Sequence, residues 1–351
     1  MSKMKVAVIG CGNIANAAHI PAYMKNEEVE IKYFCDIILE RAENCVEKYG
    51  CGTAVADYHD FLNDSEIDAV SVCTHNDFHS IIAIDFLKAG KHVFCEKPAA
   101  RILSEALEMQ NVAHETGKIL NIGVVNRFNT YVMKIRELID SGELGEVYHA
   151  YASFRKHRSI PGIGGDFTTK AKSGGGALID WGVHFIDLIM YCCGDPKPVS
   201  ASGEAFCKLG KDIKNYVYTG MWASETADVN GTYDVDDSVV GLVRTTGPVI
   251  SFNGAWAQNV GEDEMFIDFM GDKAGARLTY GGKFEIYDGA TLETISPEYD
   301  IPDQYLCEDK AFIESITTGV KDRNNIENIL ESMKLLEVLY ESSNAGKEIE
   351  I

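Results

Sequence analysis

The stretch that decides the fold is VAVIGCGNIA, residues 6–15, in which an apolar run leads directly into a glycine-rich turn. A strand, a glycine turn and a helix start follow one another as the dinucleotide-binding fingerprint requires. Gly10 permits the tight turn, Gly12 lets a pyrophosphate approach the backbone, and Ala15 keeps helix and strand close. The phosphates would then lie at the helix N-terminus, beside Asn13–Ile14. This context favours a cofactor site over the alternative, a purely structural turn.

An acidic residue ends the next apolar segment, Phe34-Cys35-Asp36. At this spacing a carboxylate accepts hydrogen bonds from the hydroxyls of the adenosine ribose, so Asp36 indicates NAD. The 2'-phosphate of NADP would meet a like charge there, although Arg41 leaves room for dual use. The alternative is a solvated acid in a turn.

Apolar strands alternate with helical stretches through the first part of the chain. Runs that are apolar throughout indicate strands buried on both faces, as in a parallel sheet. We therefore predict an α/β domain over residues 1–124, a doubly wound Rossmann fold. The expected strands are Val6–Ile9, Ile31–Cys35, Ala69–Cys73, His92–Cys95 and Ile119–Val124, with helices at Leu39–Tyr49 and Ser80–Ala89.

The pattern changes after Arg127 to alternating segments that no helices separate. This predicts an α+β domain over residues 125–351 with a large, open, mostly antiparallel sheet. The segments concerned are Val147–Phe154, Ser238–Arg244, Val249–Trp256 and Met265–Met270, flanked by helices at Tyr131–Asp140 and Ile326–Tyr340. Because an open sheet face needs a cover, we expect a homo-oligomer.

Length and charge limit the remaining possibilities. A chain of 351 residues exceeds what one core usually fills, so two domains are expected. A net charge of −22 disfavours nucleic acid and anionic membrane surfaces as partners. The first residues lead straight into a strand without a basic leader, and no apolar run approaches the roughly 20 residues that span a bilayer. With ten cysteines that stand mostly singly in apolar runs, we expect a reduced, cytoplasmic protein without zinc.

Two further segments carry candidate catalytic groups. Lys97 follows the fourth strand, at the sheet edge where ligands bind, and an amine there can hold or take the proton of a hydroxyl. Asp180 and His184 stand at i and i+4 after the glycines of residues 174–176. On a helix they share a face, so the carboxylate can orient the imidazole and stabilise its protonated form. The alternatives are a surface lysine and a structural Asp–His pair.

Together these segments resemble the glucose-fructose oxidoreductase and inositol dehydrogenase family, known as Gfo/Idh/MocA. The likeness spans nearly the whole chain. Its motifs are the fingerprint, Thr74-His75-Asn76-Asp77-Phe78-His79, Glu96-Lys97-Pro98, Arg127-Phe128, Gly174 to His184 and Ser343-Asn344-Ala345-Gly346-Lys347.

The resemblance implies an NAD-dependent enzyme whose catalytic group is Lys97, Asp180 and His184. It also implies that Thr74, Asn76, His79 and Glu96 line the cofactor, and that Arg127 and Trp181 lie near the substrate. His75 departs from the proline usual in relatives, which puts the path of that loop in doubt. His75 and His79 at i and i+4 imitate metal ligands, but no carboxylate or thiolate partner is evident, so no metal is expected.

The substrate class stays open at this level. Relatives act on inositols, free sugars, nucleotide sugars and glycosides, and the segment Ser153–Asp180 with Trp222 and Asp234–Asp237 most resembles members that oxidise the 3-hydroxyl of glycosides. A basic patch, Arg155 to Arg158, could grip an anion or form a solvated, mobile loop. The expected activity is hydride transfer between nicotinamide and a secondary alcohol of a sugar, glycoside or cyclitol. The alternatives are an inositol or nucleotide-sugar dehydrogenase, or a non-catalytic regulator that senses NAD or sugar.

Overall fold

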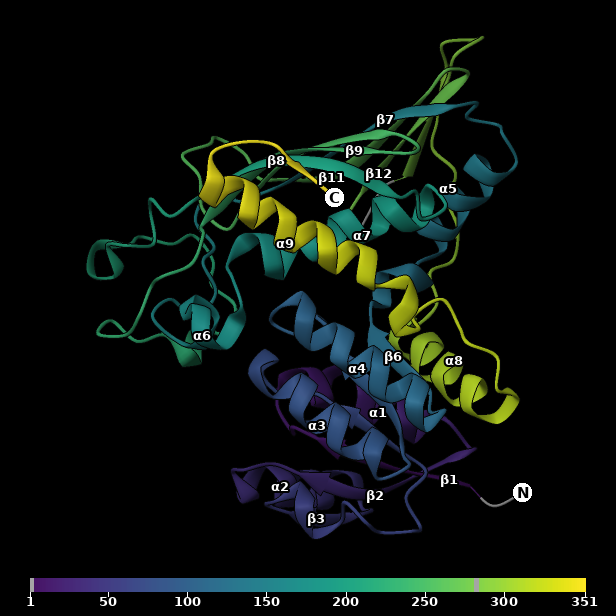
Figure 1. Cartoon of the computed structure of the whole chain (residues 1–351), viewed down its shortest axis with the longest axis vertical. Helices are drawn as coiled ribbons and strands as arrows, with labels where there is room; N and C mark the ends of the chain where they lie inside the picture. The colour runs from purple at the N-terminus through teal and green to yellow at the C-terminus, as the bar shows by residue number, and fades with distance from the viewer. Residues whose placement is uncertain (1–2, 281–283) are drawn as a thin grey trace. The chain divides into compact units, whose positions relative to one another are not determined.

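The computed structural model describes residues 3–280 and 284–351. The chain forms two compact units (Figure 1). Unit 1 consists of residues up to Phe128 together with Pro302–Leu330, and unit 2 of Asn129–Ile301 together with Glu331–Ile351. The limits expected from the sequence, 1–124 and 125–351, differ from this grouping because a late segment returns to unit 1.

Unit 1 is built on a parallel sheet, as predicted. Within the described residues the sheet has six strands in the order β3-β2-β1-β4-β5-β6, which is the order of a doubly wound dinucleotide-binding fold. The central strands are buried on both faces, which explains their uninterrupted apolar sequences. The strands are β1 (Met4–Ile9), β2 (Val29–Cys35), β3 (Thr53–Val55), β4 (Ala69–Val72), β5 (His92–Glu96) and β6 (Leu120–Gly123).

Helices connect these strands, and the returning segment adds two more among the described residues. The first helix begins with a π-helical turn, and π turns are rare and often mark functional sites. The helices are η1 (Ala15–His19), α1 (Ile20–Lys25), α2 (Leu39–Tyr49), η2 (Tyr58–Asp60), α3 (Asn76–Lys88), α4 (Leu103–Thr116), η3 (Val125–Phe128), α8 (Gln304–Thr318) and η8 (Ile326–Asn328).

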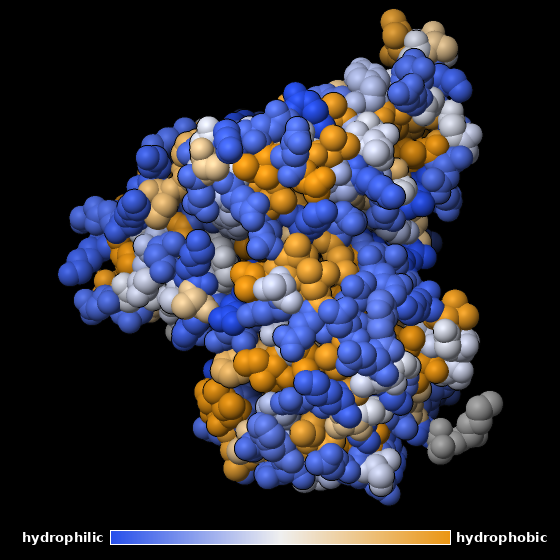
Figure 2. All heavy atoms as spheres, viewed as in Figure 1, coloured by the Kyte–Doolittle hydropathy of each residue, from blue (hydrophilic) through white to orange (hydrophobic). Residues whose placement is uncertain are grey.

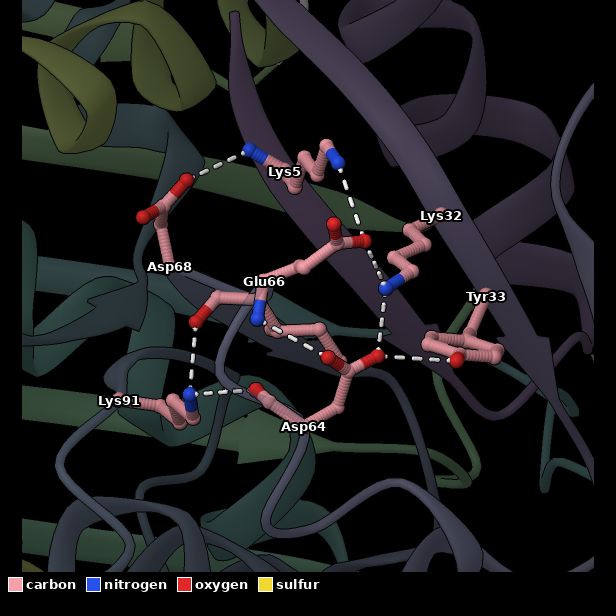
Figure 3. A network of polar contacts seen from close by, with 8 residues as sticks. Lys5, Lys32, Tyr33, Asp64, Glu66, Asp68 and Lys91 are labelled. Atoms are coloured by element: carbon pink, nitrogen blue, oxygen red, sulfur yellow. Dashed lines mark hydrogen bonds and ion pairs between the residues drawn. The ribbon is translucent and has the colours of Figure 1, made fainter.

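A polar network closes the amino-terminal edge of this sheet (Figure 3). Lys32 Nζ lies 2.6 Å from Asp64 Oδ2, and the Tyr33 hydroxyl donates to the same oxygen. Buried Lys91 donates to the carbonyls of Asp64 and Ile67 at 2.7 and 2.9 Å. These contacts order the loop before β4 at the edge opposite the glycine turn, so we assign them a structural role.

Unit 2 contains the predicted large sheet. Its order is β14-β13-β12-β11-β7-β10-β9-β8-β15 in the described residues, and every pair is antiparallel except β7 with β10. The strands are β7 (Val147–Arg155), β8 (Pro198–Phe206), β9 (Ser238–Thr245), β10 (Val249–Ala255), β11 (Glu264–Gly271), β12 (Ala274–Thr279), β13 (Phe284–Asp288), β14 (Thr294–Ile295) and β15 (Ile349–Glu350).

Two helices, α7 and α9, cover one face of this sheet (Figure 1). Phe154 on β7 stacks on Phe185 of α7, with ring centroids 4.8 Å apart, and Gly203 on β8 donates to Ser342 of α9. Because side chains alternate along a strand, Tyr151 and Leu242 face the opposite side and are half-buried. The helices are α5 (Thr130–Asp140), η4 (Asp166–Thr168), α6 (Lys170–Ser173), η5 (Leu178–Gly182), α7 (Val183–Cys192), η6 (Ile213–Asn215), η7 (Ser224–Thr226) and α9 (Leu330–Ala345).

The helix expected at Ile326–Tyr340 is divided into η8, which begins at Ile326, and α9, which ends at Ala345 rather than at Tyr340. Among residues 3–280 and 284–351, no helix has the length and hydropathy needed to cross a membrane.

Candidate active site

The glycine turn has the geometry that its sequence predicts. Gly10 has φ +89°, and a Cβ atom there would lie 2.5 Å from the carbonyl oxygen of Cys73, so no other residue fits. A Cβ on Gly12 would meet nothing within 4 Å, which leaves the backbone open to a ligand. Asn13 is exposed and Ile14 half-buried at the start of the helix, while buried Ala15 packs in the core of unit 1. The turn therefore fits a bound pyrophosphate.

Asp36 lies at the carboxyl end of β2 and holds the glycine turn. Its Oδ2 accepts the N–H of Cys11 at 2.9 Å, and its Oδ1 accepts the N–H of Ile38 at 2.9 Å. Each carboxylate oxygen has a second lone pair, so both remain able to accept ribose hydroxyls. Ile37, the next residue, is exposed. Figure 2 shows apolar side chains gathered on parts of the surface of unit 1.

His79 links the two loops that follow β4 and β5. Its Nδ1 lies 2.8 Å from Pro98 O and its Nε2 3.0 Å from Thr74 O. Burial lowers the pKa of His79, so the ring is neutral and donates to one carbonyl at a time. Half-buried Asn76 starts α3, and His75 precedes it in an exposed, extended conformation.

The imidazole nitrogens of His79 thus face carbonyl oxygens rather than a metal. In the part of the chain that the structure describes, no group of three or more His, Cys, Asp or Glu side chains could hold a metal ion.

Lys97 directly follows β5 and is half-buried. Its backbone N–H donates to Glu96 Oε2 at 3.0 Å. Glu96 is 7% exposed, and its carboxylate lies beside Gly123 of β6, where a Cβ would come within 2.8 Å of Oε1. The candidate lysine therefore extends from a backbone that a buried carboxylate holds.

Arg127 is held inside unit 1. It is 1% exposed, and its guanidinium donates to Arg323 O at 2.6 Å and to Asn328 O at 3.0 Å. These contacts fasten the returning segment to the end of β6. Its contact with substrate stays a prediction from the family resemblance.

In unit 2, Asp180 lies in the π-helical η5 and His184 in the first turn of α7. Buried Trp256, just past β10, donates its indole N–H to Asp180 Oδ2 at 3.0 Å. We expected an ordinary α-helix here, but Asp180 lies in a π turn. The sequence also did not predict that the indole of Trp256 is a partner of the Asp180 carboxylate. Trp256 lies 76 residues away, and no local pattern marks such a pairing.

A buried carboxylate fixes the entry to this helix. Asp236 accepts the backbone N–H groups of Gly176 and Leu178 at 2.8 and 2.9 Å, and the hydroxyl of Tyr340 at 2.6 Å. A Cβ on Gly176 would lie 1.9 Å from Asp236 O, so glycine is required. The acidic run Asp234–Asp237 was noted in the sequence, but its structural role was not.

Aromatic side chains surround the helix start. The rings of His184 and Tyr280 lie 6.4 Å apart, and Tyr280 stacks on Phe185 at 5.3 Å. Trp181 is half-buried against the cluster that contains Ile160 and Trp256.

Contacts within unit 2 hold the side chains of the basic patch. Arg155 forms an ion pair with Glu264 at 2.7 Å, and Lys156 pairs with Asp263 at 3.1 Å. Arg158 donates to Gln258 O at 2.9 Å and to the side chain of Asn259. The acidic partners come from a distant segment, so the charges of Arg155 and Lys156 are matched within unit 2, whereas Arg158 is held by uncharged oxygens.

The comparisons with known proteins define the class first. Residues 4–124 match the oxidoreductase family with an NAD-binding Rossmann fold, and residues 132–277 match the GFO/IDH/MocA C-terminal domain. The chain belongs to the Gfo/Idh/MocA family of NAD-binding oxidoreductases, which confirms the resemblance, the fold class and the cofactor that the sequence predicted.

Particular relatives follow. The chain is 32% identical to the D-glucoside 3-dehydrogenase of Escherichia coli K12, over 100% of this chain and 98% of the relative. It is 27% identical to the myo-inositol 2-dehydrogenase of Thermotoga maritima, over 90% and 89%. Among solved structures, an oxidoreductase domain protein from Kribbella flavida superposes with a TM-score of 0.85 at 22% identity, covering 100% of both chains. Levoglucosan dehydrogenase, complexed with NADH and levoglucosan, gives 0.83 at 18%, again over 100% of both. These two structures support the fold alone.

Proposed function

We propose that this protein is an NAD-dependent dehydrogenase that oxidises a secondary hydroxyl of a glycoside, with the 3-hydroxyl of a glucoside as the preferred position and a 3-oxo-glucoside as product. The single observation that carries the substrate class is the end-to-end match to a D-glucoside 3-dehydrogenase. The residues support the reaction type, because unit 1 has an open glycine turn and the chain has separate candidates for proton transfer.

The cofactor is held by residues at the carboxyl edge of the parallel sheet. In this proposal Gly10, Gly12 and Asn13–Ile14 contact the diphosphate, and Asp36 the ribose. Thr74, Asn76, His79 and Glu96 line the remainder. When bound, NAD supplies the acceptor for the hydride that leaves the substrate carbon.

Proton transfer is the work of Lys97, Asp180 and His184 in this proposal. His184 takes the hydroxyl proton, Asp180 supports the resulting imidazolium, and Lys97 stabilises the oxygen that becomes a carbonyl. The Trp256 N–H holds Asp180 in one orientation, which supports a fixed geometry for the imidazole. Trp181 and Arg158 contact the substrate.

A second candidate substrate is an inositol, because a myo-inositol 2-dehydrogenase matches 90% of the chain. A nucleotide sugar is less favoured, since Arg155 and Lys156 are paired with acidic residues. A regulator that only senses NAD or sugar would not need a lysine, an aspartate and a histidine at these positions.

The deciding experiment mixes purified protein and NAD with glucosides, inositols and nucleotide sugars and follows NADH absorbance. We expect the highest kcat/KM on a glucoside, with oxidation at position 3 established by NMR of the product. Lys97→Ala and His184→Ala should each lower turnover by roughly a hundredfold or more while NAD binding persists. Faster turnover of an inositol than of any glucoside would make the protein an inositol dehydrogenase instead. Near-normal turnover of Lys97→Ala or His184→Ala would remove the substituted residue from the mechanism.

We also propose a closed homo-oligomer built on the sheet face opposite α7 and α9. Tyr151, Leu242 and Phe266 lie on that face, half-buried within the chain. Beside them Arg277 and Asp268 form a paired polar contact at 2.6 Å. A second copy would cover this mixed surface with a matching one.

The cytoplasm is the proposed location. Cys95 is fully buried among apolar neighbours, and burial raises the pKa of its thiol well above the ordinary value. Thiols that serve as small core residues fit a reducing compartment.

A further inference from the structure

Three elements of unit 1 bring charged side chains together in its interior. His19 lies in η1, Glu96 ends β5 and Asp309 lies in α8 of the returning segment. His19 Nε2 is 2.7 Å from Glu96 Oε1, and its Nδ1 is 3.1 Å from Asp309 Oδ1. Their exposed fractions are 0%, 7% and 1%. Both ring nitrogens face carboxylate oxygens, so the ring donates on both sides as an imidazolium.

The charges of this cluster follow from its surroundings. Burial alone would lower the pKa of His19, but Asp309 and the bond to Glu96 raise it well above its ordinary value. Burial alone would raise the pKa of Glu96, but His19 and Lys97 lower it. Asp309 has a raised pKa because burial outweighs the effect of His19. Of the two carboxylates, Glu96 is therefore the one whose pKa lies below its ordinary value, and the hydrogen bond from His19 is the largest cause that lowers it.

Other titratable groups face the cluster from neighbouring elements. On α8, burial raises the pKa of Glu308 well above its ordinary value, and Asn324 donates to that carboxyl at 2.7 Å. Burial raises the pKa of Cys73, after β4, to about 12 and that of Tyr23, on α1, well above its ordinary value. The ring of Tyr305 meets His19 edge-on at 5.6 Å. Burial thus disfavours the charged forms of Glu308, Cys73 and Tyr23, so His19 and Lys97 supply the positive charges that lower the pKa of Glu96.

The cluster of His19, Glu96 and Asp309 is connected to Lys97 through the backbone of Lys97. Glu96 uses Oε1 for His19 and Oε2 for the N–H of Lys97. On the other side of the lysine, the carbonyl of Pro98 faces His79 Nδ1. Gly123 leaves the space that the Glu96 carboxyl occupies. The peptide groups before and after the lysine side chain are thus both anchored to buried groups.

We propose that His19 and Asp309 are positioning residues for Lys97, acting through Glu96 to fix the backbone from which the lysine side chain extends. The inference rests on the proposed role of Lys97. Apolar residues of similar volume usually stabilise a protein as much as a buried ion pair does. Three buried ionisable groups beside Lys97 therefore indicate a role in function rather than in stability alone.

The test compares His19→Gln, Asp309→Asn and Gly123→Ala in the full-length protein. Glutamine keeps polar atoms near both carboxylates but removes the charge, whereas Gly123→Ala displaces the Glu96 carboxyl and leaves the imidazolium in place. The matched control is His114→Gln, since His114 pairs with Glu327 at 2.6 Å on the surface of unit 1. The measurements are kcat, KM for substrate and NAD, and the pH profile, with thermal unfolding to establish folding.

We expect His19→Gln and Asp309→Asn to lower kcat about 10- to 100-fold with a smaller change in substrate KM, as for misplaced catalytic groups. In His19→Gln the loss should deepen as pH falls, because Glu96 then takes up a proton. Gly123→Ala should lose turnover without that change in pH profile, and His114→Gln should match the unaltered protein.

Folded His19→Gln with normal kcat and pH profile overturns the inference. If His19→Gln does not fold, normal kcat in both Asp309→Asn and Gly123→Ala overturns it equally. Normal turnover in Lys97→Ala would instead remove Lys97 from the proposed mechanism, and the inference with it. Loss in Lys97→Ala with no loss in His19→Gln defeats the inference alone.

Discussion

Replacing Trp256 with phenylalanine tests whether the orientation of Asp180 matters for turnover. The substitution keeps an aromatic ring in the core and removes the indole N–H that lies 3.0 Å from Asp180 Oδ2. A hydrogen bond to a charged group contributes about 1.5–3 kcal/mol, and each 1.36 kcal/mol of barrier is a factor of ten in rate. If most of the free energy of this hydrogen bond stabilises the transition state, kcat/KM of Trp256→Phe should fall by about 10- to 100-fold.

The assay is steady-state NADH formation with the best substrate of the panel, combined with chemical denaturation. Trp256 is 1% exposed, so the free energy of unfolding should also fall, by about 1–3 kcal/mol. Trp222→Phe is the control: the same chemical change at a residue 43% exposed, packed edge-on against Phe167. A folded Trp256→Phe protein with unaltered kcat/KM would refute the argument that this indole orients a working carboxylate.

Three further outcomes are expected. Asp36→Ala should narrow the preference for NAD over NADP, measured as dissociation constants by fluorescence titration, and tighter NADP binding by the unaltered protein would contradict the ribose assignment. The hydrogen bond and charge of Lys32 lower the pKa of Asp64 to about 2, so the stability that this carboxylate contributes should be present above about pH 3.8 and disappear as pH falls toward 2. Asp64→Asn should abolish that part of the acid dependence in denaturation curves, and an unchanged curve would dismiss the network of Figure 3 as a source of stability. Light scattering after size exclusion should give a multiple of 38.6 kDa that Phe266→Glu reduces, whereas a monomer before substitution would end the oligomer proposal.

Local sequence was sufficient for most of the fold. Apolar runs identified β1, β4, β5 and β6 to within about two residues, because a strand buried on both faces has no polar alternation. The glycine turn was equally readable, since its requirements at Gly10 and Gly12 are local. Alternation identified β7, β9, β10 and β11 for the related reason that one face of that sheet is covered.

What the sequence did not reveal depends on distant partners. Asp309 meets His19 across 290 positions, and Glu264 meets Arg155 across 109. Hydrophobic periodicity contains no information about such polar pairs, so the return of Pro302–Leu330 to unit 1 and the acidic partners of Arg155 and Lys156 were both unexpected. The π turn that contains Asp180 was also missed, because a single short turn, Leu178–Gly182, is too short for its period to be read from the apolar pattern.

The return of that segment has a consequence for synthesis on the ribosome. Unit 1 begins with the first residues of the chain, yet Pro302–Leu330 follows about 170 residues after Phe128. At roughly 5–20 residues per second, its first part waits about 10–35 s for completion. During that interval His19 lacks Asp309, and Arg127 lacks the carbonyls of Arg323 and Asn328. The nascent Rossmann sheet therefore carries two incomplete polar sites until the returning segment emerges.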